Sequence, residues 1–450
     1  MSPLSLLRRC PPTRSVCVPP RRAGRSVHLL LALVVSAGFL CGGGGAAAGG
    51  GPADSVFSVD FFGRAINFTL APDFSAHAIA ERWCAEQGLG AGEHVRAVRE
   101  VVEGAVADAL TDRIEAGMLG KDSEARWFLE SVCRDFPSLH RMKIALEVRQ
   151  EPLRIIDAFP FFNELEVLEV RLAELYPIVD KFILVESSVT HAGNPKDLFF
   201  DANLAAFDQY RDKIIHVVLD SLPESPDAWV RERAQRDGIH EGLEQAAIED
   251  QDLVLVSDAD EIPRRSTMRA LAWCSGFRPP LQLKSAFYYY SFRHRWTEDG
   301  PDGSAQPHQW RHPRAVTSGQ LAPPRVTVNH LRYDPGQGNM QEIDDAAWHL
   351  SYFGGAERIR TKIEAYGHQE NNLEEFKDLE HIRAAITRGE DVFGRGAVHG
   401  DLRENTEPLD LPWSILARAA RGDPSVGEWL PPHPWLHRAE PPGAGVGAGV

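Results

Sequence analysis

The chain has 450 residues, enough for two or three structural units of about 150 residues each. Hydrophobic residues make up 43% and charged residues 25%, which is typical of a globular protein that buries a sizeable core. The net charge of −16 argues against nucleic acid as a partner, because an acidic protein repels phosphates.

The N-terminal residues carry a targeting pattern. Residues 1–26 contain six arginines and no acidic residue, and residues 27–48 contain no Lys, Arg, Asp or Glu. A helix needs about 20 largely apolar residues to cross a bilayer, and positive charge stays on the cytosolic side. We therefore predict a basic cytosolic tail at 1–26 and a signal anchor at 27–48, as in a type II membrane protein. The alternatives are a cleaved signal peptide, an organellar transit peptide and a buried core helix.

Composition divides the rest of the chain into regions. Residues 49–74 begin with a glycine-rich run and are predicted to be a linker. Residues 75–149 are predicted to form a helical stem or accessory region, because valines such as Val95, Val98 and Val102 recur at helical spacing. The tail 421–450 is rich in Pro and Gly and is predicted to be disordered.

The six cysteines include no Cys-X-X-Cys pair, which argues against a zinc ribbon or a thioredoxin-like motif. Three of them lie before or within the apolar N-terminal segment. One structural disulfide can form among the other three, Cys84, Cys133 and Cys274. The sequence does not select the pair.

Strands alternate with helices from Arg154 onwards. This alternation predicts an α/β fold with a mainly parallel sheet across residues 150–420. The expected strands are 154–159, 181–186, 213–219, 253–257, 281–292 and 325–333. Between the last two, residues 296–309 are predicted to form a polar loop. Helices are expected at 165–179, 357–369 and 373–388.

Carboxylates follow the buried strand 253–257, at Asp258, Asp260 and Glu261. Open α/β sheets bind ligands outside the carboxyl ends of their strands. Carboxylates at that edge can hold Mg²⁺ or Mn²⁺, which bridges to the phosphates of a nucleotide. Alone, an Asp-X-Asp tripeptide is equally consistent with a solvated acidic turn.

Several segments in the same order resemble glycosyltransferase family 17, the family of the bisecting β-1,4-mannosyl-glycoprotein N-acetylglucosaminyltransferase. The resemblance covers roughly residues 150–415, and residues 1–150 do not resemble the family's usual stem. The matching segments are 154–164, 168–175, 182–186, 190–196, 229–236, 256–262, 347–355 and 362–368.

This resemblance implies a GT-A-like fold, a UDP-GlcNAc donor, a divalent metal (Mn²⁺ or Mg²⁺) and inversion at the anomeric carbon. It makes Asp258 and Asp260 the metal-binding acids, with Asp258 also near the nucleotide. The expected reaction is β-1,4 transfer of N-acetylglucosamine to the mannose of a glycoprotein N-glycan, in the lumen of the Golgi. The alternatives are a different UDP-sugar or acceptor, a non-catalytic glycan-binding protein, and a secreted or organellar protein after cleavage.

Further donor-site residues are predicted near the strand ends. Phe159, Asn163 and Glu164 belong to a loop that could enclose the uridine, although Asn163 also suits a helix cap. Glu186 ends the second strand, where it either accepts hydrogen bonds from ribose or uracil or is simply solvated.

Basic side chains are the expected partners of the diphosphate. Arg233 and Arg236 lie three residues apart on a predicted helix, and guanidinium groups match phosphate oxygens. Ion pairs with neighbouring acids are the structural alternative for both arginines. Lys196 lies in a Gly/Pro-containing loop, where it either contacts the donor or faces solvent.

Inverting transfer needs a base that accepts the proton of the acceptor hydroxyl. We predict that the base is one of Asp345, Asp344 and Glu342, with Asp345 first, because they precede the Trp348-His349 segment after a glycine-containing loop. His349 is a further catalytic candidate, as base or metal ligand, with a packed structural histidine as the alternative. Trp348 and Tyr352 are candidates for stacking on sugar rings, with core packing as the default.

Overall fold

A computed structural model describes residues 55–433 and Leu436, with gaps inside that range. The gaps are 62–63, 90–91, 116–122, 137–143, 300–303, 322–326, 334–339, 396–400 and 406–408. The predicted cytosolic tail and signal anchor, residues 1–48, lie outside the described residues. Among the residues described, no helix is both long and apolar enough to span a membrane.

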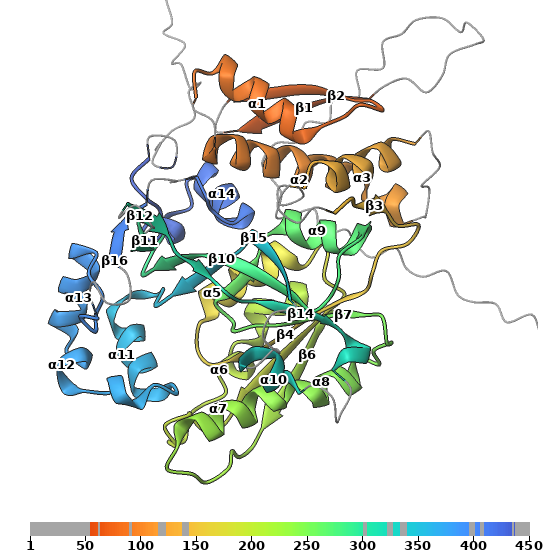
Figure 1. The fold of residues 1–450 in the computed structure, drawn as a ribbon. Coiled ribbons are helices and arrows are strands. Elements are labelled where there is room, and N and C mark those ends of the chain that lie inside the picture. The colour runs from red at the N-terminus through yellow and green to blue at the C-terminus, as the bar shows by residue number, and fades with distance from the viewer. Residues whose placement is uncertain are drawn as a thin grey trace, which may run out of the picture.

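Four parallel strands form one half of the central sheet, in the order β7-β4-β5-β6 (Figure 1). Their bounds are Ile155–Phe161 for β4, Lys181–Ser187 for β5, Ile214–Leu219 for β6 and Leu253–Val256 for β7. The chain moves outward from β4 to β6 and then returns to β7 on the other side of β4. This reversal creates a topological switch point between β4 and β7, where open α/β sheets bind ligands.

Helices cover both faces of the parallel strands, which is why the apolar runs of β4, β5 and β7 are buried. Helix α5 (Leu165–Leu175) belongs to the core on one face and α8 (Ile239–Gln245) to the core on the other. Helix α8 approaches β5 so closely that a Cβ atom on Gly242 would overlap Ile183. Shorter elements complete this half: α6 (Phe199–Ala202), η1 (Leu204–Tyr210) and α7 (Ala228–Asp237).

The other half of the sheet is mixed and begins with β14, which pairs antiparallel with β7. Strand β10 pairs antiparallel with β14 and parallel with β15, and β15 also pairs with β8. The bounds are β8 Glu261–Pro263, β10 Leu281–Tyr289, β11 His294–Asp299, β12 Ala305–Pro307, β13 Gln309–Trp310, β14 Arg314–Thr317, β15 Gln341–Ser351 and β16 Asp401–Glu404. Within the described residues the sheet has 12 strands. The predicted α/β class, with a central and mostly parallel sheet flanked by helices, is confirmed.

Strand β15 contains a bulge where it pairs with β10. Leu283 pairs with Ile343, but Ser285 pairs with Ala347, so β15 has two more residues than β10 across this step. Asp345 lies in the bulge with a left-handed φ of 52°. Bulges bend a strand and change the direction of its side chains. The residues after this bulge, Ala347 to Ser351, reach the carboxyl edge of β7.

An N-terminal region packs on top of this sheet domain, shown in red and orange in Figure 1. Its described residues form a β-hairpin and three helices. The bounds are β1 Ser55–Phe61, β2 Arg64–Leu70, α1 Ala76–Glu86, α2 Glu93–Glu115 and α3 Glu124–Arg134. The helices agree with the prediction for 75–149. The hairpin corrects the predicted linker at 49–74, because Ile66, Phe68 and Leu70 alternate with exposed residues and are buried in the core.

A disulfide joins the N-terminal region to the sheet domain. It links Cys133 of α3 to Cys274 in β9 (Cys274–Ser275), which pairs with β3 (Glu147–Val148). A buried ion-pair network reinforces this contact, since Glu103 of α2 accepts from Arg99 at 2.6 Å and from Arg269 at 3.4 Å. Arg269 belongs to α9 (Arg265–Trp273), so the network crosses the interface.

The C-terminal part adds helices on the side of β10 and β15. Trp429 and Leu430 are buried in the main core, which corrects the prediction that the tail is disordered from residue 421. These apolar side chains outweigh the local Pro and Gly content. The bounds are α11 Gly355–Ala365, η3 Gln369–Asn371, α12 Glu374–Lys377, α13 Leu379–Arg388, α14 Trp413–Ala420 and η5 Pro424–Val426.

Two further predictions between residues 296 and 333 are wrong. The expected polar loop 296–309 contains β11, β12 and β13, and β12 is fully exposed, so its sequence carries no burial pattern. The expected strand 325–333 contains instead the helix α10 (Val328–Tyr333), after the short helix η2 (Ser318–Gln320). Val328 and Leu331 pack against the core behind β7, and this tertiary contact overrides their strand preference.

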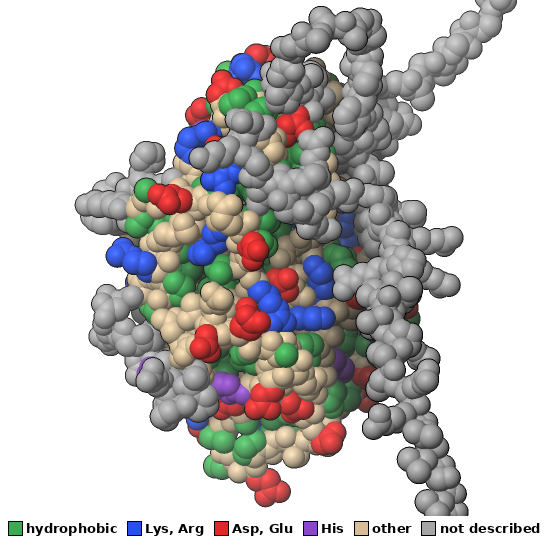
Figure 2. All heavy atoms as spheres, turned by 90° about the vertical axis from the view of Figure 1, so that its right-hand side faces the viewer, with side chains coloured by type: hydrophobic (Ala, Val, Ile, Leu, Met, Phe, Trp, Pro, Cys, Tyr) green, Lys and Arg blue, Asp and Glu red, His purple; other side chains and the backbone are tan. Residues whose placement is uncertain are grey.

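Positively and negatively charged side chains are interspersed on the face of the molecule that Figure 2 shows. Exposed ion pairs contribute only about 0–1 kcal/mol each. The stability of this fold therefore depends on its cores and on buried polar contacts, several of which surround the switch point.

Candidate active site

A cavity of about 650 Å³ opens at the carboxyl ends of β4 and β7. Its wall includes Phe161 at the end of β4, Phe162 directly after it, and Asp258 and Asp260 after β7. The cavity therefore lies at the switch point of the sheet, where ligand sites of open α/β folds occur.

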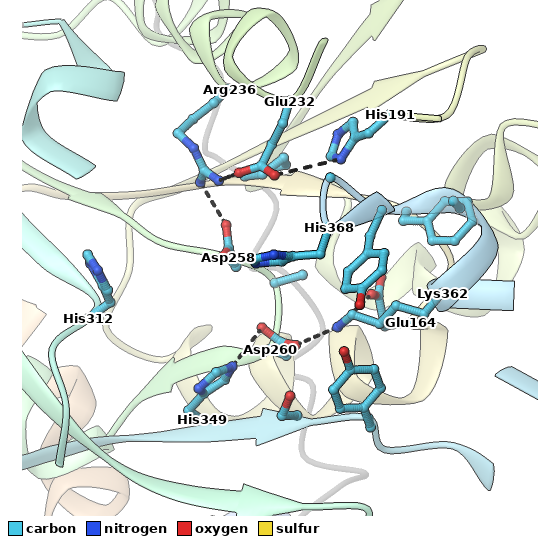
Figure 3. Close-up of a pocket in the computed structure, with 18 of the residues that line it drawn as sticks. Glu164, His191, Glu232, Arg236, Asp258, Asp260, His312, His349, Lys362 and His368 are labelled. Atoms are coloured by element: carbon cyan, nitrogen blue, oxygen red, sulfur yellow. Dashed lines mark hydrogen bonds and ion pairs between the residues drawn. The ribbon is translucent and has the colours of Figure 1, made fainter. Parts of the chain in front are cut away.

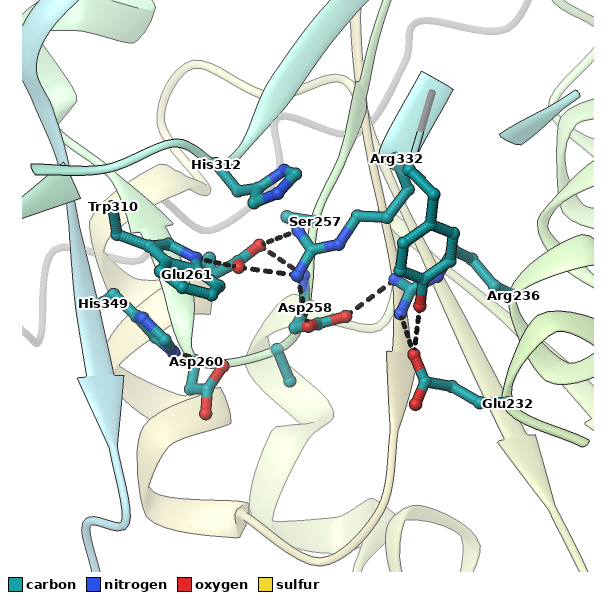
Figure 4. Close-up of polar contacts among 12 residues, drawn as sticks. Glu232, Arg236, Ser257, Asp258, Asp260, Glu261, Trp310, His312, Arg332 and His349 are labelled. Carbon is teal, nitrogen blue, oxygen red and sulfur yellow. Dashed lines mark hydrogen bonds and ion pairs between the residues drawn. The ribbon is translucent and has the colours of Figure 1, made fainter. Parts of the chain in front are cut away.

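Two arginines hold Asp258. Arg236 of α7 donates to one carboxylate oxygen at 2.7 Å, and Arg332 of α10 donates to the other at 2.6 Å (Figure 4). Arg236 also donates to Glu232 at 3.0 Å. Burial alone would raise the pKa of Asp258, but the two guanidinium groups outweigh it and hold the pKa far below its usual range. Asp258 is therefore ionised and bound on both oxygens.

Glu261 lies behind Asp258 and is completely buried. Arg332 donates to its two oxygens at 2.7 and 2.9 Å, and the indole N–H of Trp310 donates at 2.6 Å. Burial would raise the pKa of Glu261, but Arg332 outweighs it and lowers the pKa to about 2. Glu261 is thus a buried anion that orients a cation and an aromatic ring toward the cavity.

Arg171 of α5 fixes the turn that carries these acids. Its buried guanidinium donates to the carbonyl oxygens of Asp258 (3.0 Å) and Glu261 (2.8 Å) and to the carboxylate of Asp157 in β4 (2.8 Å). One arginine therefore joins the helix, the strand and the acidic turn.

Asp260 has different neighbours from Asp258 (Figure 3). Lys362 of α11 donates to its Oδ2 at 2.9 Å and lies 3.6 Å from Glu164. The Nε2 atom of His349 lies 3.7 Å from Oδ1. Burial would lower the pKa of Lys362, but Asp260 and Glu164 outweigh it and raise the pKa, so the lysine is charged.

The pair Asp260 and His349 offers an oxygen and a nitrogen to a divalent cation. Ligands of Mg²⁺ lie about 2.1 Å from the ion at octahedral angles, so two neighbouring ligands are about 3 Å apart. The 3.7 Å between Oδ1 and Nε2 is too long for a hydrogen bond and somewhat longer than this spacing, so the two side chains would draw together around an ion. No group of three or more His, Cys, Asp or Glu suited to a metal occurs among the residues the structure describes. A cation here would therefore also need phosphate or water ligands.

His349 is held between aromatic rings. Its ring stacks on Phe287 at 4.4 Å between centroids and lies 4.9 Å from Trp310. Burial lowers the pKa of His349 despite the nearby Asp260. Its Nδ1 is buried without a hydrogen-bond partner, so the imidazole is a neutral group with Nε2 directed at Asp260.

Lys196 also lines the cavity. Its ammonium lies 5.5 Å from the ring centroid of Phe162 and 3.8 Å from Glu186. Burial lowers the pKa of Lys196. Glu186 does not line the cavity but lies buried beneath it, where it accepts from the backbone N–H of Phe200 at 3.0 Å.

The structure brings six of the predicted site residues together around the cavity: Glu164, Lys196, Arg236, Asp258, Asp260 and His349. Phe159 does not line it, because its ring is fully buried under the guanidinium of Arg171. Asn163 and Glu186 also lie outside the lining. Arg233 is 45% exposed and pairs with Asp227 at 3.6 Å, so only one arginine of the predicted pair reaches the site.

The aspartates predicted as bases lie outside the cavity lining. Asp344 pairs with Lys284 at 3.0 Å. Asp345 accepts from Arg264 at 2.5 Å and lies 3.1 Å from Arg96 of α2. The β15 bulge lies at Asp345, whose side chain faces the N-terminal region, whereas Asp344 faces Lys284 of β10. Trp348 is also buried in the core, whereas Tyr352 lines the cavity.

Sequence reasoning did not assign several residues that the fold brings to the site. Lys362 belongs to a family-like segment, which was an available signal. Arg332 lies in a segment interpreted as a strand, and Trp310 lies at the end of a predicted loop. Both residues contact Glu261, which lies 49 residues from Trp310 and 71 residues from Arg332 in the sequence.

Comparison with known families defines the class of protein as a glycosyltransferase: a family model of this class matches residues 131–396, more than half of the chain. The family is glycosyltransferase family 17, and the chain belongs to it. The predicted family is therefore confirmed.

Among curated proteins, the chain is similar to the β-1,4-mannosyl-glycoprotein 4-β-N-acetylglucosaminyltransferases of Rattus norvegicus, Homo sapiens and Mus musculus. Each is 30% identical over 164 residues, which is 35% of this chain. The match spans 30% of the length of these relatives. Among solved structures, mannosyltransferase PcManGT from Pyrobaculum calidifontis, in complex with GDP-Man and Mn²⁺, aligns with a TM-score of 0.30 and 14% identity over 72% of this chain and 91% of its own. A likeness at this level supports no statement about the present chain.

Proposed function

We propose that this protein transfers N-acetylglucosamine from UDP-GlcNAc to the mannose of a glycoprotein N-glycan, forming a β-1,4 linkage with inversion. The observation that carries the proposal is the switch-point cavity, where Asp258 and Asp260 are each held by cations from other elements. Family membership and the names of the similar proteins support the donor sugar and the acceptor. We also propose that the sheet is of the GT-A type.

The cationic groups around the acids suit a diphosphate. Arg236 and Arg332 present guanidinium groups whose geometry matches phosphate oxygens, and Asp258 fixes both of them before the donor arrives. Lys362 adds a third charge beside Asp260. Preorganised charges stabilise the negative charge that develops on the departing UDP, without a cost of reorganisation at that moment.

Asp260 and His349 would hold the divalent cation, Mn²⁺ or Mg²⁺, together with oxygens of the donor. When bound, such an ion acts as a Lewis acid toward the leaving diphosphate. Asp258 is proposed to act through its arginines, because both of its oxygens already accept from them.

A Golgi location, with a type II anchor and a lumenal catalytic domain, is part of the proposal. It is supported by the basic leader, by the apolar segment 27–48 and by the disulfide, because disulfides form in the secretory pathway. Protease treatment of sealed microsomes should leave the catalytic domain intact until detergent is added. Digestion without detergent would contradict this topology.

The direct test is UDP release across a panel of UDP-sugars, with N-glycan acceptors, in Mn²⁺ or in excess EDTA. We expect acceptor-dependent release with UDP-GlcNAc in Mn²⁺ and background release in EDTA. Turnover with UDP-Glc or UDP-Gal alone would overturn the donor assignment. Full activity in EDTA would overturn the metal, and glycan binding without any UDP binding would identify a non-catalytic protein.

A further inference from the structure

The cavity has an aromatic side that the donor chemistry does not use. Phe287 and Tyr289 of β10, Trp296 of β11, Trp310 of β13 and Tyr352 after β15 all line it. We call these five residues the aromatic platform. They come from the mixed half of the sheet, whereas the nucleotide end of the cavity is built by the parallel half.

The two acids lie between these ends. Figure 4 shows Trp310 and His349 on one side of Asp258 and Asp260, and Glu232 and Arg236 on the other. The arginine side lies at the carboxyl ends of the parallel strands, where a nucleotide is expected. A sugar attached to the diphosphate would therefore reach the acids from one side and leave the aromatic side open to a second molecule.

Phe287 is the centre of the platform. Its centroid lies 5.5 Å from that of Tyr289, 5.5 Å from that of Trp310 and 5.9 Å from that of Trp296, whose ring is inclined by only 28°. Side chains alternate along a strand, so Phe287 and Tyr289 face the cavity while Tyr288 between them faces the opposite way.

Polar anchors hold the platform in place. The N–H of Trp310 donates to the buried Glu261 at 2.6 Å, and the hydroxyl of Tyr289 accepts from Arg395 at 2.6 Å. Phe287 and Trp310 remain half-buried, so part of each ring borders the cavity instead of the core. Fixed and partly exposed rings are suited to stacking, because little conformational entropy is lost on binding.

The platform suits a neutral ligand better than a phosphate. Two cations neighbour it, and each is paired with an acid: the guanidinium of Arg395 is bound by Asp391 at 2.8 and 2.9 Å, and Lys362, 5.5 Å from the ring centroid of Tyr352, donates to Asp260. Ser351 and Tyr366 supply neutral polar groups to the same part of the wall. The negative face of an aromatic ring attracts partly positive C–H groups, which one face of a hexopyranose presents.

We propose that the aromatic platform is the acceptor subsite and binds a neutral hexopyranose of the acceptor glycan against the parts of the Phe287 and Trp310 rings that His349 leaves exposed to the cavity. This inference rests on the proposed function and adds to it the half of the site that receives the sugar. The stacked residue lies on the His349 side of Asp260, so its hydroxyls reach the space next to the donor sugar.

The test compares variants that lose a ring with variants that keep one. Phe287→Leu and Trp310→Leu remove the ring, and Phe287→Tyr and Trp310→Phe retain it. We expect the acceptor KM to rise about tenfold in the leucine variants and to stay within about threefold in the ring-retaining variants. Because His349 packs between the same two rings, all four variants are assayed at saturating Mn²⁺, and in the leucine variants the acceptor KM should rise at least about threefold more than the donor KM.

Phe292→Leu is the matched control, because Phe292 is fully buried against Tyr288 and Phe353 and does not line the cavity. It should lower the thermal midpoint without raising the acceptor KM. If Phe287→Leu fails to fold, the comparison of Trp310→Leu with Trp310→Phe tests the proposal instead. An unchanged acceptor KM in the leucine variants overturns the proposal. An equal rise of donor and acceptor KM also overturns it, because the platform would then bind the donor sugar.

Failure of the proposed function gives a different result. A wild-type protein that releases no UDP from any donor refutes transfer, whatever the platform does. Calorimetry with free N-glycans then tests the platform separately. Binding to the wild type that is lost in Phe287→Leu and kept in Phe287→Tyr supports the subsite, and equal binding to both variants refutes it.

Discussion

Asp258 and Asp260 are one residue apart, yet they have different partners. Asp258 is bound on both oxygens by Arg236 and Arg332, whereas one oxygen of Asp260 faces His349 at 3.7 Å. Each oxygen of Asp258 already accepts from a guanidinium, so the positive charge of a metal ion is less favoured there than at Asp260. At the scale of single residues, the roles of the two acids should therefore separate.

Asp260→Asn should reduce transfer at least about a hundredfold and weaken Mn²⁺ binding, because it removes the charge that the cation needs. Calorimetric titration with Mn²⁺ alone and steady-state UDP release measure the two effects. Asp208→Asn is the control, since Asp208 is 66% exposed and pairs with Arg211 on the surface. Unchanged Mn²⁺ affinity in Asp260→Asn would refute the assignment.

Arg332→Met should lower the free energy of unfolding by about 3–5 kcal/mol, because it leaves Asp258 and the buried Glu261 without their common partner. Arg233→Met removes the same charge from an exposed position and should change stability by less than about 0.5 kcal/mol. Urea denaturation measures both. Equal effects in the two variants would mean that Arg332 does not neutralise the buried acids.

At the scale of elements, the bulge of β15 decides which residues reach the cavity. Arg264 donates to the carbonyl oxygen of Asp345 at 2.8 Å and to the buried Asp410 at 2.6 Å. Asp410 also accepts from the indole of Trp348 at 3.1 Å. These contacts fix the strand on the side away from the cavity, so that His349 is presented to Asp260.

Asp345→Asn should keep kcat/KM within about threefold of the wild type, whereas removal of a general base costs about a hundredfold or more. Asn tolerates the left-handed backbone of this position, so the bulge should persist. Steady-state transfer to an N-glycan measures the effect. A loss of a hundredfold with an unchanged melting temperature would restore Asp345 as the base.

The parallel half of the fold could be predicted because its strands are buried on both faces. Continuous apolar runs mark β4, β5 and β7, and the acids after β7 follow from strand order. The mixed half could not. The β12 strand is exposed, so its sequence shows no alternation of buried and exposed residues, and the short helix α10 depends on the tertiary packing of Val328 and Leu331.

The same reason limits the prediction of the site. Residues close to strand ends in sequence, such as Glu164, Lys196 and Asp260, could be assigned to it. Arg332 and Trp310 could not, because their place depends on how the mixed half folds back onto β7. The bulge had no visible signal either, and Asp344 and Asp345 beside it do not line the cavity.

At the scale of the whole molecule, the N-terminal region is part of the folded protein. The disulfide between Cys133 and Cys274 and the buried Arg99–Glu103–Arg269 network join it to the sheet domain. We therefore expect deletion of residues before 150 to destabilise the catalytic region, in contrast to removal of a flexible stem.

Cys133→Ala should lower the free energy of unfolding by about 2–5 kcal/mol, and reduction of the wild type by dithiothreitol should have a similar effect. Cys84→Ala is the control, because Cys84 is buried and forms no disulfide. Its unfolding should keep the sensitivity of the wild type to reductant, whereas that of Cys133→Ala should lose it. Sensitivity to reductant in Cys133→Ala would show that another bond is responsible.

The disulfide also makes part of the chain a covalently closed ring. It closes a ring across a sequence separation of 141, and this ring contains the whole parallel half of the sheet together with Lys196, Asp258 and Asp260. Phe287 and Trp310 lie on the chain outside the ring. A single backbone cut within the ring therefore leaves one covalently joined molecule, whereas a cut after Cys274 can separate the aromatic side from the donor side.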